Sequence, residues 1–160
     1  MDVKITGSEK KLTEDDLRRA ESVIGASLPA EYRKFLLQHN GGRPDPADFR
    51  INWKDRERLA RGWRISTVGD FHSIYDGPAL NLLEDFKFYR DRIPKDMLAV
   101  ARDPGGNAIL LGLAGDKRGR VFFWINNLPA EYTETDFANL GFIASGFDEF
   151  INSLFTADEP

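Results

Sequence analysis

Three apolar segments in the second half of the chain constrain its fold most strongly. They read LAVA at residues 98–101, AILLGL at 108–113 and VFFWI at 121–125, and Gly-rich stretches separate them. Apolar segments joined by such short turns pair as neighbouring antiparallel strands. The sequence therefore predicts an antiparallel meander over residues 98–125.

Two of these segments are apolar at consecutive positions, as at residues 109–111 and 121–124. A strand that is exposed on one face alternates apolar and polar residues, whereas a continuous apolar run is typical of a strand covered on both faces. We therefore expect helices to pack on one face of this sheet and another part of the chain to shield the other face.

Two helices are expected before residue 42. Thr13 precedes three acidic residues, which is typical of a capped helix N-terminus, and Gly25 is placed to end that helix. Pro29 suits the first turn of the second helix, and Tyr32 begins its apolar face. Residues 40–42, Asn-Gly-Gly, supply a left-handed stop.

The rest of the chain adds strands and helices in alternation. Apolar residues at helical spacing predict helices over 82–89 and 147–154, the second capped by Ser145, and alternation predicts strands over 49–53 and 63–67. Together these elements predict a single α+β domain over residues 1–160, with a core from about 12 to 155. A mostly antiparallel central sheet flanked by helices is the expected architecture.

Composition restricts the class of protein. The chain has 160 residues, 41% hydrophobic and 30% charged, which suits one globular domain. No apolar run approaches the ~18 residues of a membrane span, and residues 1–16 lack the apolar stretch of a secretory signal, so we expect a cytoplasmic protein. Without cysteine there is no disulfide, thiolate nucleophile or Cys-based zinc site.

The sequence shows no pattern of an enzyme. Its two histidines, His39 and His72, lack metal-binding spacing, and a catalytic assignment requires convergent partners. The glycines at 41–42 and 105–106 lack the spacing of phosphate-binding loops and fit a helix stop and a turn instead. We therefore expect no catalytic, metal or cofactor site.

The order of these segments resembles one known family. An acid-capped helix, LPAEYRKFLLQHNGG, then MLAVARDPGGNAILL, GRVFFWIN and a closing SGFDEFINSLF are similar to the SUKH superfamily, the Smi/Knr-like domains. The resemblance spans residues 12–155. It assigns structural roles to a set of motif residues: Leu28, Pro29, Tyr32, Leu36, Asn40, Gly41, Gly42, Gly105, Gly106, Asn107, Val121, Phe123 and Trp124.

The resemblance also implies a function. Most bacterial members of the superfamily are immunity proteins that bind and neutralise a cognate toxin, often a nuclease, of a polymorphic-toxin system. A eukaryotic branch implies an alternative, a regulatory or scaffold module linked to cell-wall synthesis. A third, less favoured hypothesis is a nucleic-acid-binding domain that uses the basic stretch 54–64, which Trp53 and Trp63 flank.

The pentapeptide LPAEY occurs twice, at 28–32 and 128–132, but the residues that follow differ, so it marks no structural repeat. After the second copy no apolar periodicity continues, and we expect an exposed loop or a single turn there. Residues 131–160 hold seven acidic residues and no Lys or Arg. We therefore expect this segment to contact a toxin through Glu131, Tyr132, Glu134 and Asp136.

Overall fold

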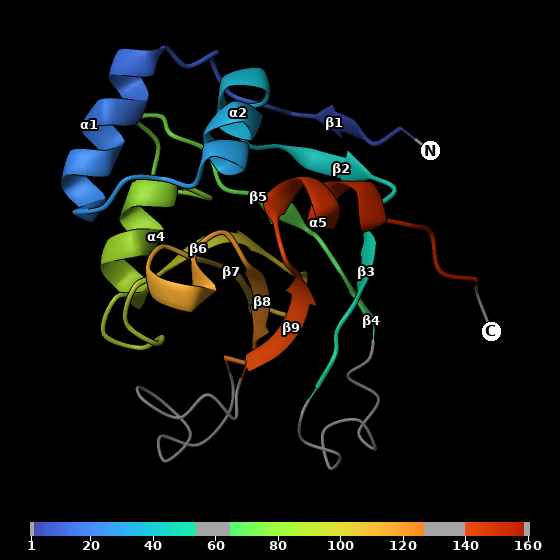
Figure 1. Cartoon of the computed structure of the whole chain (residues 1–160). Coiled ribbons are helices and arrows are strands. Elements are labelled where there is room, and N and C mark those ends of the chain that lie inside the picture. Colours follow the sequence, from blue (N-terminus) through green and yellow to red (C-terminus); the bar gives the residue numbers. More distant parts are fainter. Residues whose placement is uncertain (1, 54–64, 127–139, 159–160) are drawn as a thin grey trace.

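A five-stranded antiparallel sheet forms the centre of the computed structural model, which describes residues 2–53, 65–126 and 140–158 (Figure 1). Its strands follow the chain in the order β5 (Asp70–Phe71), β6 (Met97–Arg102), β7 (Ala108–Gly112), β8 (Val121–Trp124) and β9 (Leu140–Ala144). The predicted meander is confirmed as β6-β7-β8. The register places Ile109 opposite Phe123 and Leu110 opposite Phe122.

Four short strands form two further pairs beside the central sheet. They are β1 (Lys4–Thr6) with β2 (Arg43–Asp45), and β3 (Asp48–Arg50) with β4 (Ile65–Thr67). Beyond β3, Asn52 exchanges backbone hydrogen bonds with Phe142 of β9, at 2.8 and 3.0 Å. The β3 segment therefore continues along the edge of the central sheet.

Two helices precede the sheet, and the first begins and ends at the predicted caps. Helix α1 (Glu14–Ile24) starts with a capping box, in which Thr13 and Asp16 each bond the other's backbone N–H, and ends at Gly25 with φ 83°. Helix α2 (Ala30–Gln38) follows Pro29. Its C-cap is His39, which is extended with φ −142°, so the prediction that residues 40–42 end this helix with a left-handed stop was wrong.

Two further helices follow in the described part of the chain. Helix α4 (Leu82–Tyr89) is capped by Asn81, whose side-chain oxygen accepts from the N–H groups of Leu83 and Glu84. Helix α5 (Phe147–Ser153) is capped by Gly146 without a side-chain bond, so the prediction that Ser145 caps it was wrong. The Ser145 N–H instead donates to the Glu149 carboxylate.

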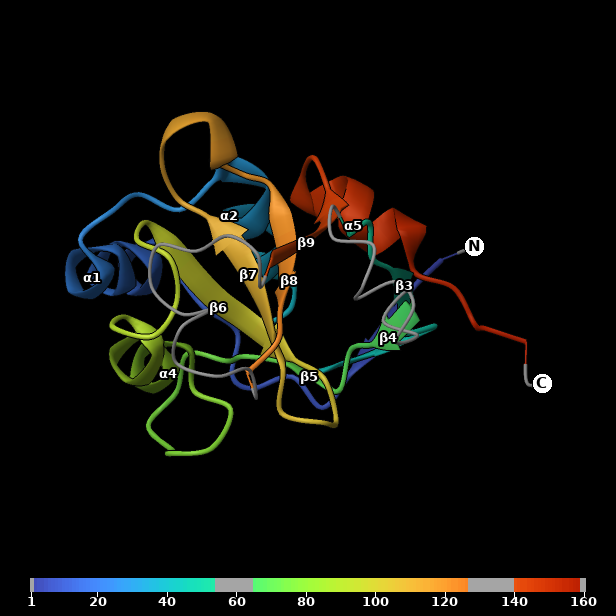
Figure 2. The ribbon, with the colours of Figure 1, turned by 90° about the horizontal axis from the view of Figure 1, so that it is seen from below.

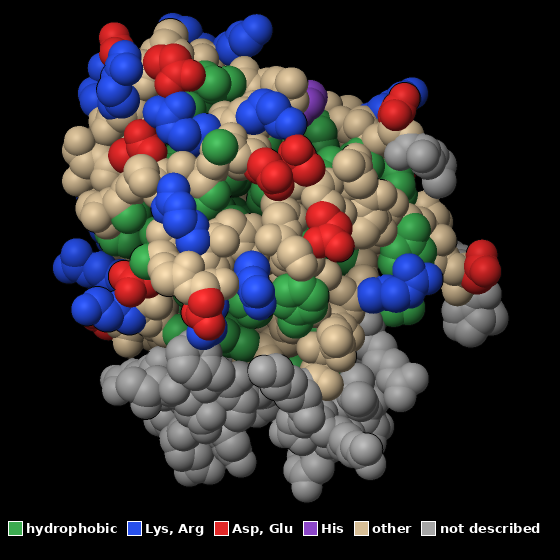
Figure 3. All heavy atoms as spheres, in the orientation of Figure 1, with side chains coloured by type: hydrophobic (Ala, Val, Ile, Leu, Met, Phe, Trp, Pro, Cys, Tyr) green, Lys and Arg blue, Asp and Glu red, His purple; other side chains and the backbone are tan. Residues whose placement is uncertain are grey.

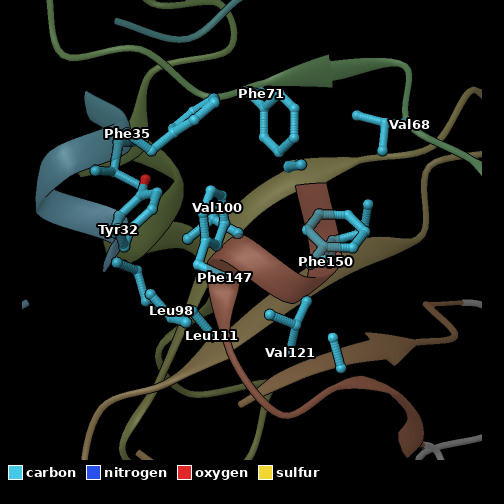
Figure 4. Packing of buried hydrophobic residues seen from close by; sticks show 14 of the residues in the cluster. Tyr32, Phe35, Val68, Phe71, Leu98, Val100, Leu111, Val121, Phe147 and Phe150 are labelled. Carbon is cyan, nitrogen blue, oxygen red and sulfur yellow. The ribbon is translucent and has the colours of Figure 1, made fainter. Parts of the chain in front are cut away.

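The main core lies between one face of the sheet and helices α2 and α5. The rings of Tyr32 and Phe35 each lie 5.0 Å from the ring of Phe147. Figure 4 shows these rings packed over Val100 and Leu111 of the sheet. The burial of such large aromatic side chains contributes much of the free energy that stabilises a domain of this kind.

A smaller apolar cluster covers the opposite face of the sheet. Trp124 and Leu110 belong to it, together with Tyr89 at the end of α4. Trp124 and its neighbour Phe123 point to opposite faces of the sheet, so Trp124 lies in this cluster whereas Phe123 packs in the main core with Tyr32. The prediction of a sheet covered on both faces is confirmed, since β8 is buried at every position.

Helices α1 and α4 lie side by side along one flank of the domain, near β6 (Figures 1 and 2). Figure 2, seen from below, shows α5 at the other flank, close to β3 and β4. The structure is thus a single α+β domain, as the sequence predicts. Within the described ranges no helix has the length and apolar character needed to cross a membrane.

Candidate functional site

Asn40 joins three separate segments of the chain. Its side-chain nitrogen donates to the carbonyls of Lys10 and Ile74, each at 2.8 Å, and its side-chain oxygen accepts from the Ile74 N–H at 2.8 Å. The Ser73 hydroxyl donates to the Asn40 carbonyl at 2.9 Å. Because this buried amide already uses both donors and its acceptor within the fold, its role is structural.

The glycines after Asn40 allow close backbone packing. Gly41 has φ 74°, and a Cβ atom there would lie 2.0 Å from the Ser73 Oγ and 2.9 Å from the Phe71 carbonyl oxygen. Gly42 has φ 116°. The Gly42 N–H donates to the Phe71 carbonyl and the Phe71 N–H to the Gly42 carbonyl, so these glycines allow β2 to approach β5 closely.

The turn at 103–107 has a polar centre. The Asp103 carboxylate accepts from the Asn107 backbone N–H at 2.8 Å and from its side-chain nitrogen at 3.1 Å. Asn107 in turn accepts from the N–H of Asn126 at 3.0 Å, and the Ser66 hydroxyl donates to Asp103 at 3.1 Å. This turn therefore fixes the position at which the chain leaves β8.

The sequence-predicted partner residues Glu131, Tyr132, Glu134 and Asp136 lie outside the described residues. The structure does place the residues that bracket them. The chain leaves β8 through Asn126 and enters β9 at Leu140. Asn52, which precedes the basic stretch 54–64, pairs with Phe142 of β9. Both charged segments therefore connect to the same end of the sheet.

A buried imidazole and a carboxylate meet between β5 and α4. His72 is 1% exposed, its Nδ1 atom lies 3.0 Å from the Ala99 carbonyl oxygen, and its Nε2 atom lies 3.0 Å from Oδ2 of Asp85. Nε2 and the carboxylate nevertheless lack hydrogen-bond geometry. Burial lowers the pKa of His72, and the Asp85 charge opposes this effect.

This pair is largely enclosed by the fold. The His72 ring has almost no contact with solvent, so its nitrogens are not accessible to a ligand, whereas 21% of the Asp85 side chain is exposed. Among the described residues no group of three His, Asp or Glu side chains is placed to hold a metal ion. No sequence pattern predicts the pair, because His72 lies in the loop after β5 and Asp85 on α4, and only folding brings them together.

An open groove of about 740 Å³ runs between α1 and the loop that precedes α4. Its lining includes the apolar side chains of Ala20, Val23 and Leu83. Basic and acidic side chains line it in equal number, namely Lys10, Lys11 and Arg19 with Asp15, Asp16 and Asp76. The groove therefore has no charge preference for one kind of ligand.

Comparison with known proteins identifies the family. A model described as the SMI1/KNR4 family (SUKH-1) matches residues 11–153. The chain is also similar to the SPbeta prophage-derived uncharacterized protein YokK of Bacillus subtilis (strain 168). The identity is 27% over 157 aligned residues, which cover 92% of this chain and 76% of that protein. The family match confirms the resemblance seen in the sequence.

Proposed function

The chain belongs to the SMI1/KNR4 (SUKH-1) family, and from this premise we propose that it is an immunity protein that binds and neutralises a cognate toxin. Members of this family are typically immunity proteins of polymorphic-toxin systems and are generally non-catalytic. The match over residues 11–153 is the observation that carries the proposal. In this role the protein acts by binding, in the cytoplasm of the cell that it protects.

The structure supports binding more than chemistry. The polar residues Asn40, Asp103 and Asn107 are buried and form hydrogen bonds within the fold. The His72 ring is buried as well, with 1% of its surface exposed. A protein with these features can neutralise a toxin by occupying its surface.

The proposed contact surface is the segment that connects β8 to β9. Glu131, Glu134 and Asp136 give it three carboxylates, with Tyr132 as an aromatic anchor. A toxin that cleaves nucleic acid needs a basic surface for phosphates, and an acidic segment is complementary to such a surface. The anchoring of Asn126 by Asn107 supports this placement, because it fixes where the segment begins.

The experiment starts from the gene neighbourhood. A toxin domain encoded beside the gene for this chain is expressed in cells with and without the chain, and the growth of the cells is measured. The affinity of the toxin domain for the purified chain is measured separately. We expect protection and a stable complex. A triple variant with Glu131→Lys, Glu134→Lys and Asp136→Lys should bind at least about a hundredfold more weakly, or ~3 kcal/mol.

A matched control reverses three exposed acids elsewhere, Asp2, Glu9 and Asp116, and should bind nearly normally because isolated surface charges contribute ~0.2–1 kcal/mol each. If the wild-type protein protects while the first triple variant binds equally well, the contact surface is wrong and the function stands. A toxin that is neither bound nor neutralised overturns the function and favours a regulatory module.

A further inference from the structure

Strand β1 has an outer edge, and in the part of the chain that the structure describes no other strand pairs with it. On its inner side β1 pairs with β2, where Ile5 lies opposite Pro44. Because Pro44 has no N–H, this pair cannot exchange two hydrogen bonds, and bonded and non-bonded pairs alternate along an antiparallel ladder. Lys4 and Thr6 therefore bond to β2, whereas the N–H and C=O of Ile5 point away from it.

These outward groups have no other partner. Within residues 2–53, 65–126 and 140–158, no backbone hydrogen bond outside the β1–β2 ladder reaches Ile5 or its neighbours along the edge, Val3 and Gly7. Lys4, whose charge could oppose a further strand, lies on the other face of β1, because side chains alternate along a strand. An unpaired edge of this kind is a template for another extended chain.

An open groove lies on the face of β1 to which Ile5 points. Its volume is about 270 Å³, and it lies between α2 and α5, with Val3 and Ile5 along it. The buried rings of Phe35 and Phe147 form part of its lining. Figure 3 shows hydrophobic side chains (green) beside a histidine (purple) in the region where Figure 1 places α2 and β1. We call the outer edge of residues 3–7 and this groove the β1 surface.

The charged side chains that line the groove already compensate each other. Lys34 and Asp148 form an ion pair at 3.0 Å, and the remaining lining residues carry no formal charge at pH 7. A charged side chain would therefore find no free counterion in the groove. An apolar side chain would be removed from water beside two aromatic rings. The groove accordingly favours an apolar occupant.

We propose that the β1 surface binds an extended segment of a protein partner, which pairs with β1 as an added antiparallel strand and places an apolar side chain in the groove. A residue directly opposite Ile5 projects from the same face as Ile5, with Cβ atoms ~4.5–5.5 Å apart, so its side chain lies at the groove. Main-chain hydrogen bonds then supply affinity, and the groove supplies specificity.

A second copy of this chain fits the β1 surface less well. If two β1 strands paired about a two-fold axis with Ile5 opposite Ile5, each copy would contribute a side chain that already packs against its own core. Neither groove would then gain an occupant. The segment of a different partner can carry a free apolar side chain at this position.

This inference is independent of the proposed immunity function, because it requires no toxin and uses none of the residues between β8 and β9. It can therefore be tested with a partner-free selection. A phage library of random peptides is panned on the immobilised full-length protein, and the enriched peptides are synthesised. Each peptide is then N-methylated at one backbone position at a time, and its affinity is measured by fluorescence anisotropy.

We expect N-methylation to weaken binding at least about tenfold at every second position of a short stretch, because only alternate N–H groups of an added antiparallel strand face β1. A peptide that binds through its side chains alone would show no such alternation. This scan uses the wild-type protein, so it tests the proposal whether or not a variant of β1 folds.

Two variants test the β1 surface from the side of the protein. Ile5→Pro removes the outward N–H without breaking a bond to β2, and Gln38→Trp fills the groove from α2. Each should bind the peptides at least about tenfold more weakly than the wild type. Ile5→Ala keeps the N–H and should bind more tightly than Ile5→Pro. Ser22→Trp adds the same ring at an exposed position of α1 and should bind normally.

Four outcomes would overturn the proposal. One is a selection that enriches no peptide. Another is a loss of affinity on N-methylation that does not alternate along the peptide. A third is equal binding by the wild type, Ile5→Pro and Gln38→Trp. The fourth is a wild-type dimer that Ile5→Pro dissociates, which would assign the outer edge of β1 to a second copy of this chain.

Discussion

The Nε2 atom of His72 lies 3.0 Å from Oδ2 of Asp85, so a buried imidazole from the loop after β5 faces a carboxylate on α4. The other ring nitrogen, Nδ1, lies 3.0 Å from the Ala99 carbonyl oxygen, which can only accept a hydrogen bond. Nδ1 must therefore carry the proton of the neutral ring. Nε2 then presents a lone pair toward the carboxylate, which makes the protonation of this pair important for stability.

The first prediction concerns pH. Burial is the largest cause that lowers the pKa of His72, and nearby Arg102 acts in the same direction, whereas the charges of Asp85 and Asp70 raise it. An unfolded chain has a His pKa of about 6.5, so below that pH it binds more protons than the folded protein. The free energy of unfolding should therefore fall as the pH drops below about 6.5, and urea denaturation across this range measures it.

The imidazole signals of the two histidines allow the titration to be followed directly by NMR. The variant His39→Gln assigns the remaining signal to His72. In Asp85→Asn the carboxylate that raises the pKa is lost, so His72 should titrate at still lower pH. A pKa of His72 above 6.5 in the wild type would show that the ion pair outweighs burial and would contradict the prediction.

Tyr32 provides a second test, because its hydroxyl is buried and forms no hydrogen bond with the described residues. Burial accordingly raises the pKa of Tyr32. An unsatisfied buried hydroxyl costs ~1–3 kcal/mol. Tyr32→Phe retains the ring contact with Phe147 and should raise the free energy of unfolding by ~1 kcal/mol.

Chemical denaturation of Tyr32→Phe beside Tyr32→Ala measures this contribution. The alanine variant loses the whole ring and should be less stable than the wild type by ~3–5 kcal/mol. A clear loss of stability in Tyr32→Phe would instead show that the hydroxyl has a partner, such as an internal water molecule.

Trp124 tests the second apolar cluster. It is 2% exposed and packs edge-on against Tyr89, with ring centroids 5.9 Å apart. Trp124→Ala should lower the free energy of unfolding by ~3–5 kcal/mol, while Trp124→Phe, which keeps an aromatic ring, should lose less. A wild-type denaturation midpoint for Trp124→Ala would mean that this cluster contributes little to the fold.

The elements that the sequence predicts correctly have local causes. Thr13 and Gly25 delimit α1 through caps that depend on neighbours in the chain, and the meander over 98–125 follows from apolar segments joined by short turns. Strands β1 and β2 contain three residues each and pair across about forty positions. No periodicity is visible in so short a strand, so neither was predicted.

Contacts between residues far apart in the sequence explain why strand β9 and the His72–Asp85 pair were not predicted. Strand β9 was not predicted, although it is anchored by β8 on one side and by Asn52 on the other. The pairing of His72 with Asp85 depends on how α4 packs against β6. The exposed position of Phe88 on α4 likewise follows from which helix face is buried, and apolar residues at 82, 83, 86, 88 and 89 leave that face ambiguous.

The last prediction distinguishes two physical reasons why a position requires glycine: a left-handed backbone, and a lack of space for a side chain. Gly25 and Gly41 both have positive φ, 83° and 74°, but a Cβ at Gly25 would meet nothing within 4 Å. Gly25→Ala should therefore cost only the left-handed backbone penalty of ~1–2 kcal/mol. At Gly41 the same penalty applies, and the added methyl group would also clash with the Phe71 carbonyl oxygen at 2.9 Å and with Ser73.

Gly41→Ala should thus be less stable than Gly25→Ala by at least ~1 kcal/mol, the usual cost of overpacking. Urea denaturation of both variants gives this difference. Adding Ser73→Ala to Gly41→Ala removes the hydroxyl but leaves the backbone carbonyl in place, so stability should not be restored. Equal stabilities of the two alanine variants would show that β2 and β5 can move apart, and that Asn40, rather than the close approach at Gly41, holds this part of the fold together.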